Sequence, residues 1–292
     1  MSFKYFLLLL LYSTAALTKT TFTFRGGESI DDHRQLYLQE VLTLALDKTI
    51  DDYGEYELIS TAEGLNLARV LRQLEEKFYP NFFLRTSMTD QISDRFTVVP
   101  FPVDRGVSGY RIAFVQNGKE RQFCTANLPD IEKYSIVQGV AWLDGDILRA
   151  NNLRVYDSSS YDNMFEMINV GRMDLFFRAI NEVKDEYTTK SQALKGLQIE
   201  SCIALYYPLP RFFITNKDNQ ANAQRIYQGL SRAFNDGSFQ KIWKQFFAES
   251  MQMVKLNQRR IIELDNPFIK ELNKDYEQYN FVMSEYLNTA AK

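Results

Sequence analysis

The side chains best suited to meet a charged ligand lie in residues 171–183, whose sequence is GRMDLFFRAINEV. The apolar run from Met173 to Phe177 predicts a buried strand, and Arg178 follows it directly. A buried strand that leads into a charged residue is a common way to place a side chain in a cleft. A guanidinium in that place favours an anionic group, because it can donate paired hydrogen bonds to a carboxylate.

Residues for catalysis or metal binding are scarce. His33 is the only histidine and lies in a polar DDHRQ stretch, which is typical of a surface residue. One histidine and two distant cysteines argue against structural zinc, and neither a P-loop nor a G-x-G-x-x-G motif is present. The carboxylate pairs Asp51–Asp52 and Glu75–Glu76 are chain neighbours, which do not share a helix face. We therefore expect no catalytic residue, metal or cofactor, and no enzyme activity.

The first residues, MSFKYFLLLLLYSTAALTKT, have the order of a secretory signal peptide. Lys4 precedes an apolar run over residues 6–12, and the small residues Thr14 and Ala16 predict cleavage after Ala16. The run is shorter than the ~20 residues that span a bilayer. A buried N-terminal strand or helix is the alternative. No cysteine follows the run, so we expect an exported protein that is not a lipoprotein.

Two cysteines leave two alternatives open. Export permits a disulfide between Cys124 and Cys202. Cys202 also lies in an apolar CIALYY run, so both residues could be unpaired and buried. The sequence does not supply the Cα–Cα distance that a disulfide requires.

Composition limits the class of protein. The chain has 292 residues, 45% of them hydrophobic, which suffices for one large domain or two medium ones. Its 34 basic and 37 acidic residues nearly cancel without a long run of one sign, so neither nucleic acid nor a membrane surface is an expected partner. Most of the 22 Phe and 17 Tyr residues belong in a core, and some could line a binding cleft.

The first part of the chain alternates strands and helices. Strands are predicted at residues 20–24, 56–60 and 81–87, and helices at 35–48 and 62–78. The first helix should bury Leu38, Val41, Leu42 and Ala45, and the second Leu67, Leu71, Leu74 and Phe78. This alternation is typical of a parallel sheet covered by helices.

A second alternating unit follows a break at residues 100–109 that holds two prolines and two glycines. Strands are predicted at 110–115, 134–139, 153–157 and 173–177, and helices at 143–152 and 158–170. The Ser158–Ser160 run could cap the latter helix.

The third part starts with two strand-like pieces that Pro208 and Pro210 divide. Two amphipathic helices follow, with apolar faces Ile226, Leu230, Ala233, Phe234 and then Phe239, Ile242, Trp243, Phe246, Phe247. The breaks at 100–109 and 207–210 bracket the second unit. Two connections between two lobes make a hinge and a cleft.

Six stretches in this order carry a resemblance to a known family: DRGVSGYRI, GVAWLDGDILRANNLRVY, MFEMINVGRMDLFFRAINEV, LYYPLPRFFITNK, RIYQGLSRAFNDGSFQKIWKQFF and RRIIELDNP. The chain resembles type II periplasmic solute-binding proteins, the solute-binding protein family 3 class that includes polar amino-acid binders, in the transporter substrate-binding subgroup. The resemblance implies an α/β fold of two lobes, each a mostly parallel sheet flanked by helices, joined by two crossover strands. Lobe 1 would hold residues 17–106 and 211–292, and lobe 2 residues 107–210, after a signal peptide at 1–16.

The resemblance also implies binding residues. An arginine of lobe 1 clamps the ligand carboxylate in amino-acid binders, and Arg95 in SDRFTVVPFP occupies that place; a surface residue beside Asp94 is the alternative. Those proteins have an acid for the ligand ammonium at the position of Ala179, so this chain departs from the pattern. That departure puts an α-amino-acid ligand in doubt, and Arg178 points to an anion instead. Glu182 and Asp174 are the nearest acids, and Asp174 could instead order the strand end or pair with Arg172.

Other candidates lie where strands of lobe 2 end. Gly139 ends a predicted strand before a helix, and helix N-termini offer N–H groups to anions. Trp142 could stack on a ligand or pack in the core. Arg105, in the DRGVSG break, completes the expected ligand-binding set.

The expected function is an exported, periplasmic solute-binding protein that captures a small polar, anionic ligand between its lobes and closes by hinge motion. The expected partners are that small molecule and an inner-membrane permease or sensor, and the protein is expected to be a monomer. A ligand-sensing module, or a divergent non-transport protein of the same fold, is the alternative.

Overall fold

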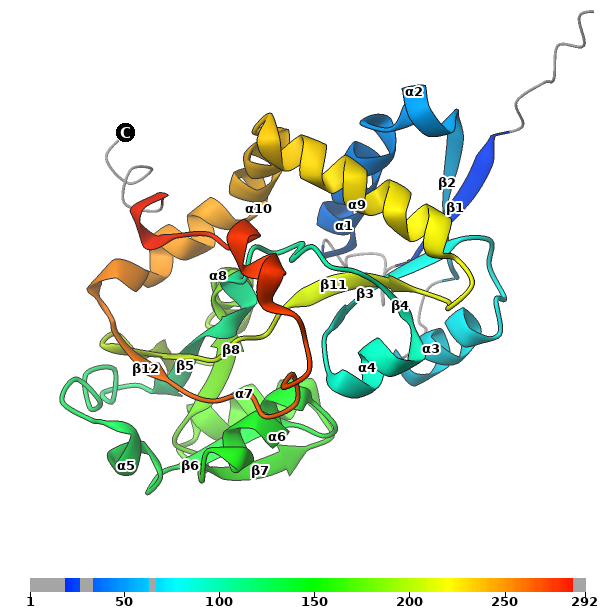
Figure 1. Ribbon diagram of the computed structural model, residues 1–292. Helices are drawn as coiled ribbons and strands as arrows, with labels where there is room; N and C mark the ends of the chain where they lie inside the picture. Colours follow the sequence, from blue (N-terminus) through cyan, green and yellow to red (C-terminus); the bar gives the residue numbers. More distant parts are fainter. Residues whose placement is uncertain (1–18, 27–33, 63–66, 286–292) are drawn as a thin grey trace, which may run out of the picture.

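The computed structural model describes residues 19–26, 34–62 and 67–285. These residues form two lobes, each with a mixed sheet and flanking helices (Figure 1). The two-lobed α/β class expected from the sequence is confirmed. The expected signal peptide, His33 and part of the helix expected at 62–78 lie outside the described residues.

The first lobe is built on a five-stranded sheet in the order β2-β1-β3-β11-β4. β1 pairs in parallel with β2 and β3, whereas β11 is antiparallel to β3 and β4. The strands are β1 (Thr20–Phe24), β2 (Tyr56–Ser60), β3 (Phe82–Ser87), β4 (Thr97–Val99) and β11 (Arg211–Thr215). The helices are α1 (Arg34–Asp47), α2 (Ile50–Tyr53), α3 (Leu67–Glu75), α4 (Asp90–Arg95), α9 (Gln220–Asn235) and α10 (Ser238–Val254).

The second lobe has the strand order β12-β10-β5-β8, with β9 paired to β5 and a parallel β6–β7 pair beside it. Its strands are β5 (Tyr110–Gln116), β6 (Ser135–Gly139), β7 (Arg154–Ser158), β8 (Phe176–Ala179), β9 (Leu197–Ile199), β10 (Ile203–Tyr206) and β12 (Arg260–Glu263). Its helices are α5 (Leu128–Ile131), α6 (Leu143–Ala150), α7 (Tyr161–Asn169) and α8 (Ile180–Lys190). Short 3-10 helices are η1 (Val107–Gly109), η2 (Leu256–Gln258) and η3 (Lys274–Tyr279).

The compact unit expected between residues 134 and 177 is confirmed as β6-α6-β7-α7-β8. A parallel bridge between Ile136 and Leu175 places β6 beside the start of β8. The last strand was expected from Met173, but β8 begins at Phe176 and includes Arg178. The reason is that Asp174 turns to bind the start of β6, accepting from Ser135 N at 2.9 Å and from Ser135 Oγ at 2.7 Å.

The apolar faces of the helices agree only in part with the sequence. In α1 all four expected residues are buried. The face predicted for α3 is right for Leu74, which is buried, and for Leu71, which packs against the core. It is wrong for Leu67 and Phe78, which are 45% and 65% exposed. Phe78 lies beyond the helix, which ends at Glu75 before Lys77 takes a positive φ of 55°.

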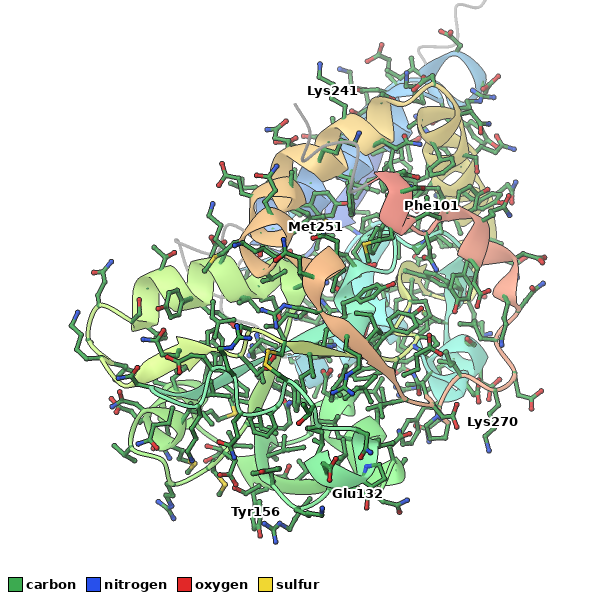
Figure 2. The ribbon with its side chains drawn as sticks, turned by 90° about the vertical axis from the view of Figure 1, so that its left-hand side faces the viewer. Phe101, Glu132, Tyr156, Lys241, Met251 and Lys270 are labelled. Carbon is green, nitrogen blue, oxygen red and sulfur yellow. A yellow bond between two sulfur atoms is a disulfide. The ribbon has the colours of Figure 1, made fainter. Side chains whose placement is uncertain are left out.

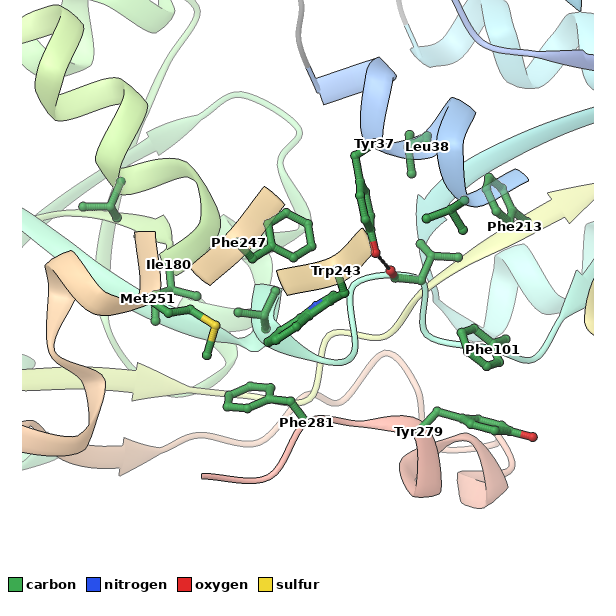
Figure 3. Packing of buried hydrophobic residues seen from close by; sticks show 14 of the residues in the cluster. Tyr37, Leu38, Phe101, Ile180, Phe213, Trp243, Phe247, Met251, Tyr279 and Phe281 are labelled. Carbon is green, nitrogen blue, oxygen red and sulfur yellow. Dashed lines mark hydrogen bonds between the residues drawn. The ribbon is translucent and has the colours of Figure 1, made fainter. Parts of the chain in front are cut away.

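α10 joins the two lobes into one hydrophobic core. Its Trp243, Phe247 and Met251 belong to a buried cluster that also holds Tyr37 of α1 and Ile180 of α8 (Figure 3). The rings of Tyr37 and Phe247 are 4.7 Å apart. The expected face of this helix is therefore confirmed, with Phe239, Trp243 and Phe247 buried and Ile242 and Phe246 half-buried.

The chain crosses between the lobes more often than the sequence suggested. Residues 100–109 link β4 to β5, and residues 207–210 link β10 to β11. All of residues 211–292 were expected in lobe 1, but β12 lies within that range and pairs in parallel with β10 of the second lobe. In Figure 2, Glu132 and Tyr156 mark the far end of the second lobe, Lys241 marks the first, and Met251 of α10 lies between them.

Among the described residues, none of the helices combines the length and the apolar character that a membrane span requires.

The two cysteines form a disulfide between Cys124 and Cys202, whose Cα atoms are 4.8 Å apart. Cys202 precedes β10, and Cys124 lies in the loop between β5 and α5. The bond therefore ties that loop to the second lobe. It also closes a loop of 78 residues, which limits the conformations of the unfolded chain.

Replacing both cysteines (Cys124→Ser with Cys202→Ser) should lower the free energy of unfolding by about 2–4 kcal/mol, because the unfolded chain gains loop entropy. Urea unfolding of the oxidised protein and of the variant measures this loss. Ser201→Ala, which alters the neighbouring residue but keeps the disulfide, is the matched control. Equal stability of the double variant and the control would contradict the prediction.

Candidate functional site

Polar side chains gather where β6 and β8 end and where α6 and α8 begin. Gly139 is the last residue of β6, and Arg178 and Ala179 end β8. In open α/β sheets ligands bind outside the carboxyl ends of parallel strands. This edge of the second lobe is therefore the candidate site.

Arg178 is buried there, with its side chain only 8% exposed. Its Nε donates to Glu186 Oε1 at 2.8 Å, and its Nη2 donates to the same oxygen at 2.5 Å. Nη2 also lies 3.0 Å from Glu182 Oε2. Both carboxylates come from α8, the helix that follows β8 directly.

Aromatic rings surround the same guanidinium. Its carbon is 4.8 Å from the ring centre of Trp142, 5.7 Å from Tyr161 and 5.4 Å from Phe176. Tyr161 also donates its hydroxyl to Glu186 Oε1 at 2.6 Å. The rings favour the cation and exclude water from the ion pair.

Two carboxylates face one guanidinium in this cluster, so its formal charge is −1. Burial alone would lower the pKa of Arg178, but Glu182 and Glu186 outweigh it and raise that pKa. Burial raises the pKa of Glu186, and the charge of Arg178 opposes that rise. Arg178 is therefore charged at any physiological pH, and its partners compensate it within the lobe.

A second buried ion pair lies on the other face of the sheet. Arg111 Nη2 is 2.5 Å from Asp144 Oδ1, and Tyr207 donates its hydroxyl to the same oxygen. Arg111 is the cross-strand partner of Ala179. Ala179, at the position where the resemblance expects an acid, therefore has Arg111 as its neighbour on the adjacent strand. The carboxylate that pairs with Arg111 comes from Asp144 of α6.

Sequence reasoning missed Arg111, Asp144 and Tyr207. A signal was present, because Arg111 interrupts the apolar YRIAFV strand at a position whose side chain is 1% exposed. A charge at a buried strand position requires a partner of opposite charge.

Gly139 and Trp142 lie in contact at the start of α6. A Cβ atom on Gly139 would fall 2.4 Å from Trp142 Cε2, so this close approach requires glycine. The first turn of α6 carries Asp144 and Asp146. Their negative charges already interact with the helix N-terminus, which weakens it as an anion site.

Glu182 has a second contact besides Arg178. Its Oε2 accepts from the backbone N–H of Ala179 at 3.2 Å. At the neighbouring helix, Ser160 Oγ accepts from Asn163 N at 3.3 Å, which confirms the capping prediction for the serine run.

Two other expected ligand residues have partners elsewhere. Arg95 is half-exposed at the end of α4 and pairs with Glu75 of α3 at 2.7 Å. Arg105 is 1% exposed, and Glu285 accepts from its guanidinium at 2.8 and 3.0 Å. Its Nε also donates to Tyr279 O at 3.1 Å. The structure therefore brings Gly139, Trp142, Arg178 and Glu182 together and places Arg95 and Arg105 apart from them.

Two hollows among the described residues lie away from this edge. One of only about 10 Å³ lies between α10 and the end of the described chain, lined by Trp243, Lys244, Ala248, Met251, Gln252, Phe281 and Glu285. An open groove of about 380 Å³ follows α1. Within the described residues, no cluster of three or more His, Cys, Asp or Glu side chains is arranged to hold a metal.

No family model matches the chain, and no curated protein is similar to it in sequence. Solved structures do share its fold. A structure from Streptococcus mutans, described in work on glutathione import through GshT and the cystine ABC importer TcyBC, has a TM-score of 0.58 at 13% identity and covers 79% of this chain and 95% of its own. The probable amino-acid ABC transporter extracellular-binding protein YtmK of Bacillus subtilis has a TM-score of 0.58 at 9% identity, over 78% of this chain and 98% of its own.

The VFT2 domain of Bordetella pertussis BvgS has a TM-score of 0.56 at 11% identity, over 78% of this chain and 93% of its own. In each case nearly the whole solved chain is matched. The chain therefore has the two-lobed fold of type II periplasmic binding proteins, as the sequence led us to expect.

Arg178→Ala should lower the free energy of unfolding by about 3–5 kcal/mol at pH 7, because it leaves two buried carboxylates without their cation. Burial already raises the pKa of Glu186, and loss of the opposing charge of Arg178 would raise that pKa further above the unfolded value. Protonation of the folded state should therefore make the loss smaller at pH 4.5 than at pH 7.

Arg95→Ala is the matched control, since it breaks an exposed pair that contributes about 1 kcal/mol or less. Urea unfolding of both variants at the two pH values measures the difference. Equal losses for the two arginines, or a loss for Arg178→Ala that does not change with pH, would contradict the buried cluster.

Proposed function

We propose that the protein is an exported solute-binding protein, which captures a small polar ligand between its lobes and closes by hinge motion to deliver it to a membrane transporter. The observation that carries the proposal is the match of the two-lobed fold over nearly the full length of solved binding proteins. The connections at residues 100–109 and 207–210 support a hinge between the lobes.

In the proposed site, Arg178 meets an anionic group of the ligand and Trp142 packs against it. Arg178 has carboxylate partners already, so the ligand must replace one of them. Glu182 is the exchangeable partner, because its side chain is 15% exposed, more than that of Glu186, and its Oε2 lies 3.0 Å from Arg178 Nη2. The side chain of Glu186 is 9% exposed and accepts several hydrogen bonds from Arg178, so it would hold the guanidinium in place.

The rest of the expected function belongs to the same proposal. It includes export through a cleavable signal peptide at residues 1–16, a periplasmic location and a monomeric state. We assign no catalytic role to any residue. The names of two neighbours link them to ABC importers, which supports a permease as the partner.

A sensor is the second candidate function. The fold is compatible with this role, because it also occurs as a single domain within BvgS, at a level of similarity like that of the importer proteins. In that case the closed form would act on a membrane signalling partner rather than a permease. Purification with crosslinking from native membranes would identify which class of partner the protein contacts.

A thermal-shift screen of small organic anions, amino acids and peptides tests ligand binding. A ligand at 100 times its dissociation constant should stabilise the folded protein by about 2.7 kcal/mol. Trp142→Ala should abolish the shift, and Arg95→Ala should leave it unchanged. A ligand whose shift survives Trp142→Ala would place the site elsewhere.

Glu182→Gln tests the anion exchange separately. It removes the carboxylate that competes with the ligand for Arg178, so anions should bind the variant more tightly than the wild type. Titration calorimetry with the anion found in the screen measures the change. Weaker binding of the anion by the variant would contradict the exchange.

A further inference from the structure

The C-terminal part of the chain crosses the hinge and is fixed on both sides of it. It begins in the second lobe with β12, which runs parallel to β10. Just before β12, Arg259 donates to Glu200 Oε2 at 3.1 Å and to Ile203 O at 2.9 Å, and both side chains of this ion pair are buried. The strand is therefore firmly part of the second lobe.

Asp265 is fixed to that lobe by its backbone. Its N–H donates to Asn151 Oδ1 at 3.0 Å, and its carbonyl accepts from Asn151 Nδ2 at 2.8 Å. Asn151 follows α6, so this pair of hydrogen bonds fixes Asp265 to the second lobe.

Three residues later the chain is held by the first lobe. The carbonyl of Phe268 accepts from Asp90 N at 2.8 Å, at the start of α4. Between the two anchors, Asn266 Nδ2 donates to Pro208 O at 2.8 Å, on the 207–210 connection. The three peptide units from Asp265 to Phe268 can extend to about 11 Å at most, so the anchors have little freedom to separate.

The segment then covers the hinge from the first lobe. Tyr276 packs on Phe212 with ring centres 5.1 Å apart, and Tyr279 packs on Phe101 at 4.5 Å. Phe281 N donates to Arg105 O at 2.9 Å. The ring of Phe281 lies 5.4 Å from that of Tyr110, at the start of β5.

The carboxylate of Glu285 closes this arrangement. It accepts two hydrogen bonds from Arg105, at 2.8 and 3.0 Å, on the 100–109 connection. Both interlobe connections are thus bound by one segment, residues 264–285, which we call the strap.

We propose that the strap restrains the hinge: the lobes open only when the strap releases one of its two ends. The hinge end consists of Phe281 and Glu285 on Tyr110 and Arg105. The second-lobe end consists of Asp265 on Asn151. The restraint is a property of the chain without ligand, so it stands independently of the proposed function.

Spin labels at Asp51→Cys in α2 and Glu166→Cys in α7, both exposed, report the distance between the lobes by pulsed electron resonance. The ligand-free protein should give one narrow distribution. Combining Phe281→Ala with Glu285→Gln should add a second population at longer distance. Asn151→Ala, which frees the other end, should do the same.

Lys270→Ala is the matched control, because this exposed residue lies in the strap and should leave the distribution narrow. Circular dichroism checks that each variant is folded, and if one end variant fails to fold, the variant at the opposite end still gives the result. An unchanged distribution in a folded end variant, or a wild-type protein that already shows both populations, would overturn the restraint.

Discussion

Burial of α10 from two sides is the constraint on which the arrangement of the lobes depends. One apolar stripe on this helix faces Tyr37 of the first lobe through Phe247, and the next turn reaches Ile180 of the second through Met251 and Ser250. Apolar burial stabilises by about 25 cal/mol for each Å² removed from water, so neither lobe can leave this helix without a large loss. Motion between the lobes must therefore turn around α10 rather than separate the lobes from it.

The alternation of strands and helices could be predicted because it depends on local periodicity. β1, β2 and the buried face of α1 follow from residues that are neighbours in sequence. The features that were mispredicted depend on contacts between residues that are far apart in the sequence. β8 starts late because Asp174 binds Ser135, and the stretch around β12 joins the second lobe because Arg259 meets Glu200. No local pattern contains those partners.

In the candidate site, too, the partners of buried charges could be predicted from the sequence only in part. Four buried guanidinium groups, those of Arg105, Arg111, Arg178 and Arg259, have carboxylate partners. The buried guanidinium of Arg225 instead donates to Thr49 Oγ1 and Gly54 O. For Arg178 the sequence did hold a clue: Glu182 and Glu186 follow at intervals of four, which places both on one face of α8. An arginine at a strand end therefore indicates a ligand site only when one of its acids is exchangeable.

The proposed site and the restrained hinge fit together in a specific way. Gly139, Trp142, Arg178 and Glu182 all belong to the second lobe, so the first contacts with a ligand do not need lobe closure. A wide opening would be needed only if the first lobe blocked this edge. With the strap bound, ligand exchange would depend on the local movement of Glu182, whereas release of the strap would add rotation of the lobes around α10. Glu182 would then control the affinity for the ligand, whereas Arg105 and Glu285 would control the motion of the lobes.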